Sequence, residues 1–584
     1  MRIAIVGSGV SGLSALWVRS PLSSLSHAAA SAHTAQLLKQ YSDHEVNIYE
    51  KNSFAGGHAH SAEFRRDGKE PCFVDTGFMS FHPRGSPNLL RFFKLLGVPL
   101  VQTDASLSVS RQGQVQWATR LGRGFRLTNI LNPRDYLLEA DEGETQITLE
   151  EYLNREGYSR GFFDDYLFPL IAVLLLVPDD QTALSMPAAT VIATLADHNM
   201  LKWKSPHGWL SVEGGAKTYV DAIVSTVPPE NLHFNTEIVS ITSESYGVRL
   251  VEASGANHIY DHVILATPSN NSLAMLRRGG WASPLEETVL GSTKWTPLEA
   301  ELHWDDKVAG SNVPNDDHVV GGTTATGRTA ITAINYDAHP APPPYNDEVQ
   351  ARTEQVSVTF DMNKIQGLSL DKHGPVRLTL NPSWPAEPTD SEHPEHPSRT
   401  GAQRWATEFP HQTATTIPKL RHLPEIQSYR RISYTGSWAG CGRHEDGFAA
   451  AYALVTGGPF NANAPFALEY ADGAALLGLA AFMTQDSGAD ADADAASPNG
   501  SAATESTALL APSAASVPRR KLKSKKSTGK LAIALMDATR RSLVSPLWPL
   551  FTWPVVLALA IAERVMRPFH RGATLAELKR GWQG

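Results

Sequence analysis

The chain opens with a short apolar run that is followed at once by a cluster of glycines. Residues 2–6 read RIAIV, a pattern typical of a buried parallel strand. The run stops at residues 7–12, GSGVSG, where a helix is expected to begin. Further apolar runs predict additional strands at 45–49, 73–74, 234–241 and 260–268.

Other segments have a different pattern. Residues 87–98 predict an amphipathic helix ended by a glycine, and Thr148-Leu149-Glu150-Glu151 has the form of a helix capping box. Residues 167–177, LFPLIAVLLLV, are continuously apolar, too short to span a bilayer, and expected in a protein core. Residues 291–425 predict a second sheet, with the clearest alternation at 298–304.

The glycines at 7–12 have the G-x-G-x-x-G spacing of a dinucleotide-binding turn. Gly7 permits the tight turn, Gly9 lets the backbone approach a pyrophosphate, and Gly12 lets the following helix pack on the strand. The helix N-terminus adds free N–H groups and the positive end of its dipole. The sequence therefore predicts a nucleotide site at this turn.

The acidic residue expected to bind the ribose comes later than the usual spacing of about 20 residues. Glu50 ends the strand predicted at 45–49, and the excess length is interpreted as a surface insertion at 20–35, rich in Ser and Ala. A carboxylate at Glu50 is able to accept hydrogen bonds from both ribose hydroxyls. It would also repel the additional phosphate of NADP.

Further motifs extend this pattern in a fixed order. Gly56-Gly57 follows Glu50, Asp75-Thr76-Gly77-Phe78 follows the next strand, and residues 434–447 read YTGSWAGCGRHEDG. These motifs resemble those of the flavin amine oxidase superfamily. The likeness is greatest to a branch of predicted NAD/FAD-binding amine-oxidase-domain proteins related to carotenoid desaturases and polyunsaturated fatty acid isomerases. The resemblance covers residues 1–480.

The resemblance implies FAD as the cofactor and assigns residues to its binding. These are Gly7, Gly9, Val10, Ser11, Gly12, Glu50, Lys51, Gly56, Gly57, His58, Thr76, Gly77, Phe78, Ile238, Ala266, Thr267, Gly436, Glu445, Asp446 and Gly447. A helix expected from Phe448 would direct its N-terminus toward the flavin. No metal site is predicted.

The implied fold is an α/β Rossmann-like FAD-binding domain interleaved with an α+β substrate domain. Residues 1–103, 206–290 and 426–480 are expected to form the FAD-binding domain, and residues 104–205 and 291–425 the substrate domain. By the same resemblance, the apolar run at 167–177 is an alternative candidate for a tunnel wall.

The expected chemistry is the transfer of a hydride between a substrate C–H and flavin N5. An apolar or lipid substrate such as an unsaturated fatty acid is favoured, with desaturase, oxidase and isomerase all open. The alternatives are oxidation of a small amine or polyamine, and a membrane-tethered FAD-binding protein without turnover. No catalytic base is assigned; His58 and His444 are the candidates to test. Substrate identity, electron acceptor and oligomeric state stay open.

Composition and the C-terminal region indicate where in the cell the protein is expected. The 584 residues carry a net charge of −9 and two cysteines, which disfavours nucleic acid as a partner and a disulfide scaffold. No signal peptide is expected, because a strand begins at residue 2. Residues 484–518 are rich in Ala, Ser and Asp and predict a disordered linker.

The region 519–584 combines a polybasic run with an uncharged apolar stretch. Residues 519–526 read RRKLKSKK, and residues 543–562 contain two tryptophans and three prolines without a charge. Basic residues beside interfacial tryptophans favour attachment to an anionic cytosolic leaflet. The alternative is a helix packed on the enzyme's own surface. The sequence thus predicts a cytosol-facing enzyme associated with a membrane through its C-terminus.

Overall fold

The structure is a computed structural model of the whole chain. It describes residues 1–17, 45–111, 114–118, 147–198, 200, 208–304, 332–340, 354–382, 403–462 and 465–469. The chain divides into two compact units, Met1–Asp490 and Ala491–Gly584, and all described residues belong to the first. The insertion predicted at 20–35, the linker at 484–518 and the region 519–584 lie outside the described residues.

Five parallel strands form the first sheet, in the order β19-β13-β1-β2-β9. They are β1 (Arg2–Val6), β2 (Glu45–Tyr49), β9 (Leu232–His233), β13 (His262–Leu265) and β19 (Ile432–Tyr434). The predictions at 2–6 and 45–49 are confirmed. Because all strands run the same way, their carboxyl ends meet at one edge, where the glycine turn also lies.

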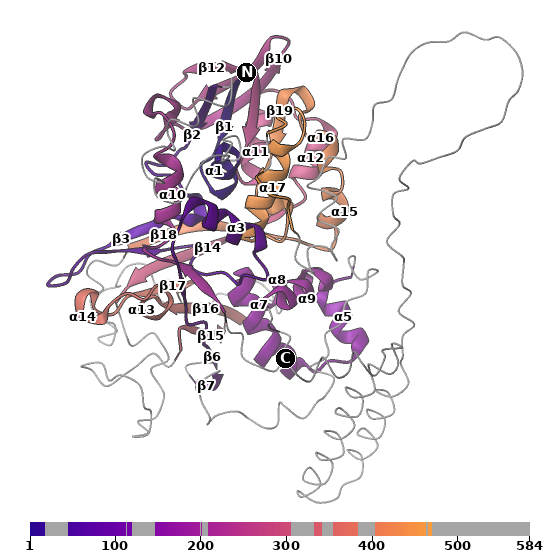
Figure 1. Cartoon of the computed structure of the whole chain (residues 1–584). Coiled ribbons are helices and arrows are strands. Elements are labelled where there is room, and N and C mark those ends of the chain that lie inside the picture. Colours follow the sequence, from indigo (N-terminus) through magenta and orange to yellow (C-terminus); the bar gives the residue numbers. More distant parts are fainter. Residues whose placement is uncertain are drawn as a thin grey trace, which may run out of the picture. The chain divides into compact units, whose positions relative to one another are not determined.

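Each face of this sheet is covered by a layer of other elements (Figure 1). Ile3 and Ile5 pack with α1 (Val10–Trp17), α3 (Pro87–Leu96), α10 (Lys217–Val224) and α17 (His444–Thr456). Ala4 and Val6 pack with β10 (Ile238–Glu244), β11 (Gly247–Glu252), β12 (Asn257–Tyr260), α11 (Ser269–Arg278) and α12 (Pro284–Leu290). The alternation along β1 therefore separates two cores, as expected for a central parallel strand.

Two of the predicted strands differ from the structure. The prediction of one strand at 234–241 is wrong, because the chain turns at Asn235, whose φ is 52°. β9 ends before this turn and β10 begins after it. The run predicted at 260–268 is divided between β12 and β13, which are separated by Asp261. The backbone N–H of Asp261 donates to the Arg2 carbonyl. Apolar composition alone does not register such turns.

A seven-stranded sheet of order β18-β14-β17-β16-β15-β6-β7 forms the second part. Its strands are β6 (Leu107–Arg111), β7 (Gln114–Ala118), β14 (Lys294–His303), β15 (Ile334–Pro340), β16 (Glu354–Asp361), β17 (Arg377–Leu380) and β18 (Gln403–His411). One face packs on α5 (Leu149–Glu156), α7 (Phe168–Leu175), α8 (Asp180–Ser185) and α9 (Ala188–Asp197). The capping box at Thr148 and the strand at 298–304 are confirmed.

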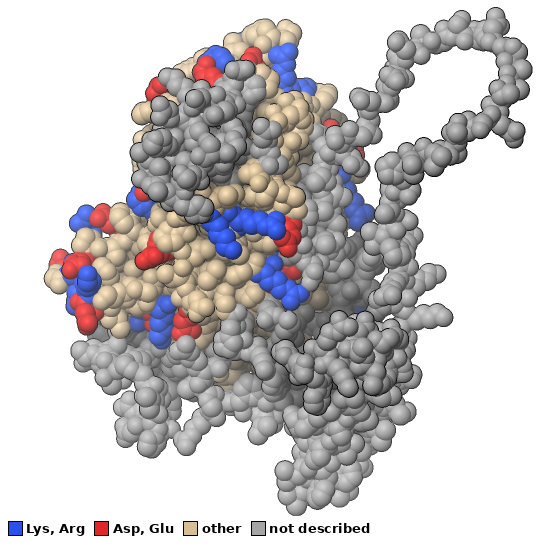
Figure 2. Space-filling model, in the orientation of Figure 1, with Lys and Arg blue, Asp and Glu red and all other residues tan. Residues whose placement is uncertain are grey.

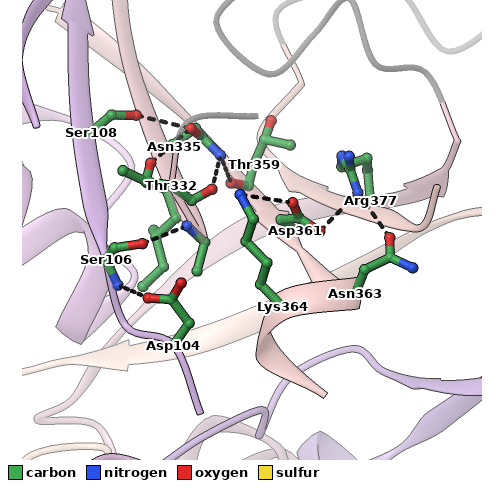
Figure 3. Close-up of polar contacts among 12 residues, drawn as sticks. Asp104, Ser106, Ser108, Thr332, Asn335, Thr359, Asp361, Asn363, Lys364 and Arg377 are labelled. Atoms are coloured by element: carbon green, nitrogen blue, oxygen red, sulfur yellow. Dashed lines mark hydrogen bonds and ion pairs between the residues drawn. The ribbon is translucent and has the colours of Figure 1, made fainter. Parts of the chain in front are cut away.

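The opposite face of this sheet is polar and nevertheless buried (Figure 3). Arg377 pairs with Asp361 at 2.9 Å, and the Asn335 side chain accepts a hydrogen bond from Ser108 at 2.9 Å. Because paired strands point their side chains to the same face, the strand register collects these groups in one layer. The apolar face is therefore the one available to the helices.

Short antiparallel pairs connect the two sheets. β3 (Ser61–Phe64) pairs with β4 (Cys72–Asp75), and β5 (Leu100–Gln102) pairs with β8 (Leu210–Val212). β4 and α3 agree with the predictions at 73–74 and 87–98. The structure defines a parallel α/β sheet and a second mixed sheet with helices; the domain boundaries given above stay predictions.

The described surface carries charges of both signs. On the face shown in Figure 2, Lys and Arg side chains lie beside Asp and Glu side chains. Elsewhere in the described residues, Arg249 pairs with Glu244 at 2.6 Å. Among the described helices, none has both the length and the apolar character needed to cross a membrane.

Candidate cofactor and active site

Two glycine-containing turns and the first turn of α17, which contains Gly447, meet at the carboxyl edge of the parallel sheet. Gly9 forms a bridge with Gly56, and a Cβ on Gly57 would lie 3.0 Å from the Gly9 Cα. A Cβ on Gly447 would lie 2.8 Å from Val10 and 2.9 Å from Ser11. By contrast, in the part of the chain that the structure describes, no atom beyond the two chain neighbours lies within 4 Å of the position of a Cβ on Gly9. The predicted glycines thus surround one open position.

This position fits the pyrophosphate of a dinucleotide. The first N–H groups of α1, from Val10 onward, have no partner within the helix and lie at its positive end. A residue with a side chain at Gly9 would fill the space in front of them. The residues present therefore fit the group that the sequence predicts, and the fit depends on the absence of a side chain at Gly9.

Glu50 lies beside this turn and also stabilises it. Its carboxylate accepts hydrogen bonds from the Ser8 backbone N–H at 3.0 Å, the Ser8 hydroxyl at 2.7 Å and the Asn52 N–H at 2.9 Å. A carboxylate offers about four acceptor positions. Three are used by the protein, so the geometry leaves room for one ribose hydroxyl rather than for both.

The helix expected from Phe448 begins four residues earlier, at His444. The Asp446 side chain accepts from the Arg443 backbone N–H at 2.9 Å and completes a capping box. Glu445 and Asp446, both predicted to bind FAD, therefore lie in the first turn of α17. Their side chains point to different parts of the protein.

Glu445 binds the start of α3. Its carboxylate accepts from the backbone N–H groups of Asn88 at 3.1 Å and Leu89 at 2.8 Å, and from the Asn88 side chain at 2.7 Å. Burial raises the pKa of Glu445 to about 7, against the lowering effect of these hydrogen bonds. The Glu445 side chain connects α17 with α3. Because its carboxylate is bonded to α3, only the backbone of α17 is left to contact a group in the open position at Gly9.

Asp446 belongs to a buried ionic cluster. The Arg443 guanidinium lies 3.1 Å from Asp446 and 3.0 Å from Asp197 at the end of α9. Asp446 also accepts from the Cys441 backbone N–H at 2.9 Å. The two carboxylates hold the pKa of Arg443 well above its usual value despite burial. The cluster connects α9 with the first turn of α17.

The His444 side chain contacts neither α3 nor the ionic cluster, but Tyr219 and Phe78. Its Nε2 lies 2.7 Å from the hydroxyl of Tyr219, and its ring stacks on Phe78 with ring centroids 3.9 Å apart. Burial and the nearby His58 lower the pKa of His444 to about 3, so the imidazole is neutral at physiological pH. A neutral imidazole in this position can exchange hydrogen bonds but carries no charge.

His58 lies next to His444 but contacts the second sheet. Its Nε2 is 3.1 Å from the Glu408 carbonyl oxygen and 3.2 Å from the Thr407 hydroxyl, and its ring stacks on Phe409 with centroids 4.6 Å apart. Burial lowers the pKa of His58. The Phe78 backbone N–H donates to the His58 carbonyl at 2.8 Å, and the Phe78 ring stacks on His444, so both histidines contact Phe78.

The other predicted residues are distributed around the same edge. Ala266 follows β13, and its carbonyl would lie 2.7 Å from a Cβ on Gly7. Gly436 lies over Trp438, whose Nε1–H donates to the Thr267 carbonyl at 3.2 Å. Gly77 approaches His58, and the Thr76 hydroxyl donates to the His60 carbonyl at 3.0 Å. Lys51 is exposed and Ile238 is buried at the start of β10. Their roles in binding stay predictions.

The sequence did not identify several residues of this region. Tyr219, Asn88, Asp197 and Phe409 fix the orientation of predicted site residues, although they are distant in sequence and lie in ordinary helix or strand patterns. Arg443 is part of the predicted motif, but its partner Asp197 precedes it by 246 positions. No local pattern marks such pairs.

Comparison with known proteins identifies the family. Residues 33–168 and 175–289 match the family model described as flavin containing amine oxidoreductase. The protein belongs to the flavin amine oxidase superfamily. It is an FAD-dependent oxidoreductase with an α/β FAD-binding domain and a substrate domain. No curated protein matches the sequence.

Solved structures of similar fold include two enzymes. A fatty acid isomerase from P. acnes that produces CLA has 16% identity and a TM-score of 0.48, with 78% of this chain and 98% of that chain covered. Cyclohexylamine oxidase from Brevibacterium oxydans IH-35A has 13% identity and a TM-score of 0.48, with the same coverages of 78% and 98%.

Asp75 is buried directly before the predicted Thr76-Gly77-Phe78 segment. Its protonation in the folded protein can be tested through the pH dependence of stability. It accepts from the Ser61 hydroxyl at 2.5 Å and the Ala216 N–H at 2.8 Å, and burial raises its pKa from 3.8 to about 7. The folded protein therefore keeps a proton that the unfolded chain loses. The resulting stability is complete below pH 3.8 and is lost as the pH rises through 7.

Replacing Asp75 with Asn removes this titration. The free energy of unfolding of the wild type minus that of Asp75→Asn is expected to fall by about 2 kcal/mol between pH 5 and pH 8. Thermal or urea unfolding at both pH values measures this difference. A difference that is constant or increases with pH would show that Asp75 is already ionised in the folded protein at pH 5.

Proposed function

We propose that this FAD-dependent oxidoreductase acts on an apolar, unsaturated substrate such as a polyunsaturated fatty acid. Bound flavin would supply the hydride acceptor. The protein would hold the substrate chain on an apolar surface, exclude water and present the two neutral histidines to the reacting region. Oxidation, desaturation and isomerisation are all compatible with this arrangement.

The observation that carries the proposal is the apolar surface beside His58. Phe409, which stacks on His58, also packs against the hydrophobic core of the seven-stranded sheet. Two residues along β18, the buried His411 lies near the backbone of Leu175 and Leu176 at the end of α7, and its Nδ1 is 2.9 Å from the Thr296 hydroxyl. Residues 173–176 are apolar and only partly buried. Partly buried apolar side chains thus lie both beside His58, at Phe409, and at the end of α7.

This arrangement refines the prediction for the run at 167–177. Phe168 and Ile171 are buried in the core, whereas 173–176 are partly exposed. The two expectations for this run therefore apply to different halves of it. The first half is core, and the second half supports the proposal of a surface for an apolar substrate.

An anaerobic absorption spectrum tests the proposed substrate class. We expect the flavin bands to bleach on addition of a polyunsaturated C18 fatty acid, but not with its saturated analogue or a long-chain primary amine. Where the bands persist, analysis of the double-bond positions in the recovered lipid would reveal isomerisation. Bleaching by the amine alone, or an unchanged lipid together with unchanged bands, would contradict the proposal.

A substitution in the apolar surface supplies a second measurement. Phe409→Asn should raise the fatty acid concentration needed for half-maximal reaction about tenfold or more, because the apolar contact of the partly buried ring with the substrate is lost. Phe73 is a matched control, since its side chain is 43% exposed. Phe73→Asn should leave the concentration dependence unchanged. Equal effects of the two substitutions would argue against the role of Phe409.

We further propose that the region 519–584 attaches the enzyme to an anionic membrane surface, which suits a lipid substrate. The support is the polybasic run at 519–526 and the apolar stretch at 543–562. Deletion of 519–584 should move the protein from the membrane pellet to the supernatant on sedimentation. High salt should weaken the attachment of the full chain. Continued sedimentation of the truncated protein with membranes would contradict this proposal.

A further inference from the structure

The hydrogen bond between Tyr219 and His444 constrains which nitrogen of His444 carries the proton. The Tyr219 side chain is fully buried, among Phe92, Phe93 and other apolar residues. Its hydroxyl has one hydrogen to donate, and its only hydrogen-bond partner among the described residues is Nε2 of His444, at 2.7 Å. If Nε2 carried a hydrogen, the phenolic hydrogen would be buried without an acceptor, which costs about 1–3 kcal/mol.

Tyr219 is therefore the donor and Nε2 of His444 the acceptor. A neutral imidazole carries one hydrogen, so the hydrogen of His444 is on Nδ1. No hydrogen bond connects Nδ1 with another described residue. The low pKa of His444 keeps the ring neutral over the physiological range. His444 is thus equipped to donate one hydrogen bond through Nδ1 to a bound group.

The same reasoning gives the opposite result for His58. Its Nε2 lies 3.1 Å from the Glu408 carbonyl oxygen, which can only accept. Nε2 must therefore carry the hydrogen, because two lone pairs would otherwise face each other. The Thr407 hydroxyl, 3.2 Å from the same nitrogen, is compatible as a second acceptor. Nδ1 of His58 is left with a free lone pair.

We propose that the two adjacent histidines are held in opposite tautomers, with His444 as a hydrogen-bond donor and His58 as a hydrogen-bond acceptor toward bound cofactor and substrate. Tyr219 and the Glu408 carbonyl are the positioning groups. Of the two candidates given by the sequence, only His58 then has the free lone pair that a base requires. The identity of the bound groups rests on the proposed function. The assignment of the two tautomers does not, because it follows from the hydrogen bonds of the two histidines.

Nuclear magnetic resonance of the flavin-loaded full chain, with 15N-labelled histidine, tests the proposal. Two-bond proton–nitrogen correlations distinguish Nδ1–H from Nε2–H, and the spectra of His444→Gln and His58→Gln assign the two rings by loss of signals. We expect Nδ1–H for His444 and Nε2–H for His58, without titration of His444 between pH 5 and pH 8. The same tautomer for both rings, or Nε2–H for His444, would overturn the proposal.

Tyr219→Phe tests the cause of the arrangement. Loss of the donor should move His444 from the Nδ1–H form to predominantly Nε2–H, the form that free imidazole side chains prefer. Tyr452→Phe is a matched control, because the Tyr452 hydroxyl lies in the same core and donates to the Phe466 carbonyl instead. An unchanged His444 tautomer in Tyr219→Phe would contradict the role of Tyr219.

The wild-type spectrum decides the tautomers even if Tyr219→Phe does not fold. The spectra also report the tautomers whether or not a substrate reduces the flavin. A failure of the proposed function would appear in the anaerobic titration alone, while a failure of the present inference would appear in the histidine spectra alone.

Discussion

Gly9→Val is expected to yield a folded protein that retains no FAD. Among the described residues beyond its two chain neighbours, no atom lies within 4 Å of the position that a Cβ on Gly9 would occupy, so the valine Cβ has room in the protein itself. It would instead occupy the space in front of the first turn of α1, where the pyrophosphate is expected. Loss of glycine before α1 should cost at most about 1 kcal/mol of folding stability.

The flavin content of purified Gly9→Val, read from visible absorption, should fall from near one per chain to near zero. Its far-ultraviolet circular dichroism should match that of the wild-type apoprotein. Gly12→Ala is the informative control, because a Cβ there would lie 2.0 Å from the Gly7 carbonyl oxygen. This variant should lose solubility rather than only FAD. Normal flavin content in Gly9→Val would refute the location of the cofactor.

Arg443→Ala is expected to lower the free energy of unfolding by about 3–5 kcal/mol. The guanidinium lies between the carboxylates of Asp197 and Asp446, and all three side chains are at most 9% exposed. Its removal would leave two buried carboxylates facing each other without the cation between them. Because the Asp446 side chain caps the first turn of α17, the loss should also release that turn.

Chemical unfolding of the purified holoprotein measures the change, and the flavin content of the variant reports on α17. Arg65→Ala is the matched control, because the pair of Arg65 with Glu63 at 2.5 Å is solvent-exposed. Such pairs contribute little. The double substitution of Arg443 to Met and Asp197 to Asn should recover part of the stability, since one buried charge is removed with the cation. Equal stability of Arg443→Ala and the wild type would show that the buried cluster is not ionised.

The sequence was sufficient for the parts of the fold that depend on local pattern. Glycine spacing at 7–12 located the turn, because a Cβ at Gly12 is impossible beside the Gly7 carbonyl. Alternation located β14, and the Thr148 capping box located the start of α5. In each case the residues that determine the structure are within one turn or one strand of each other.

The directions of the side chains in the first turn of α17 could not be predicted in the same way. His444, Glu445 and Asp446 are consecutive, yet they contact Tyr219, α3 and the Arg443–Asp197 pair, respectively. The carboxylates of Glu445 and Asp446 have buried protein partners, and their binding of FAD stays a prediction. Which partner each side chain meets depends on tertiary packing, and one sequence contains no record of it.

The order of strands in the parallel sheet has a consequence for synthesis of the protein. β1 and β2 are translated early, but their sheet is completed by β13 and then by β19, which ends at Tyr434. The turn at Gly447 that closes the glycine-lined position comes later still. At about 5–20 residues per second, roughly 20–90 s of translation separate the first strand from this glycine. During that interval the nascent chain exposes an incomplete sheet, and the glycine-lined position for FAD is complete only after Gly447 has been synthesised.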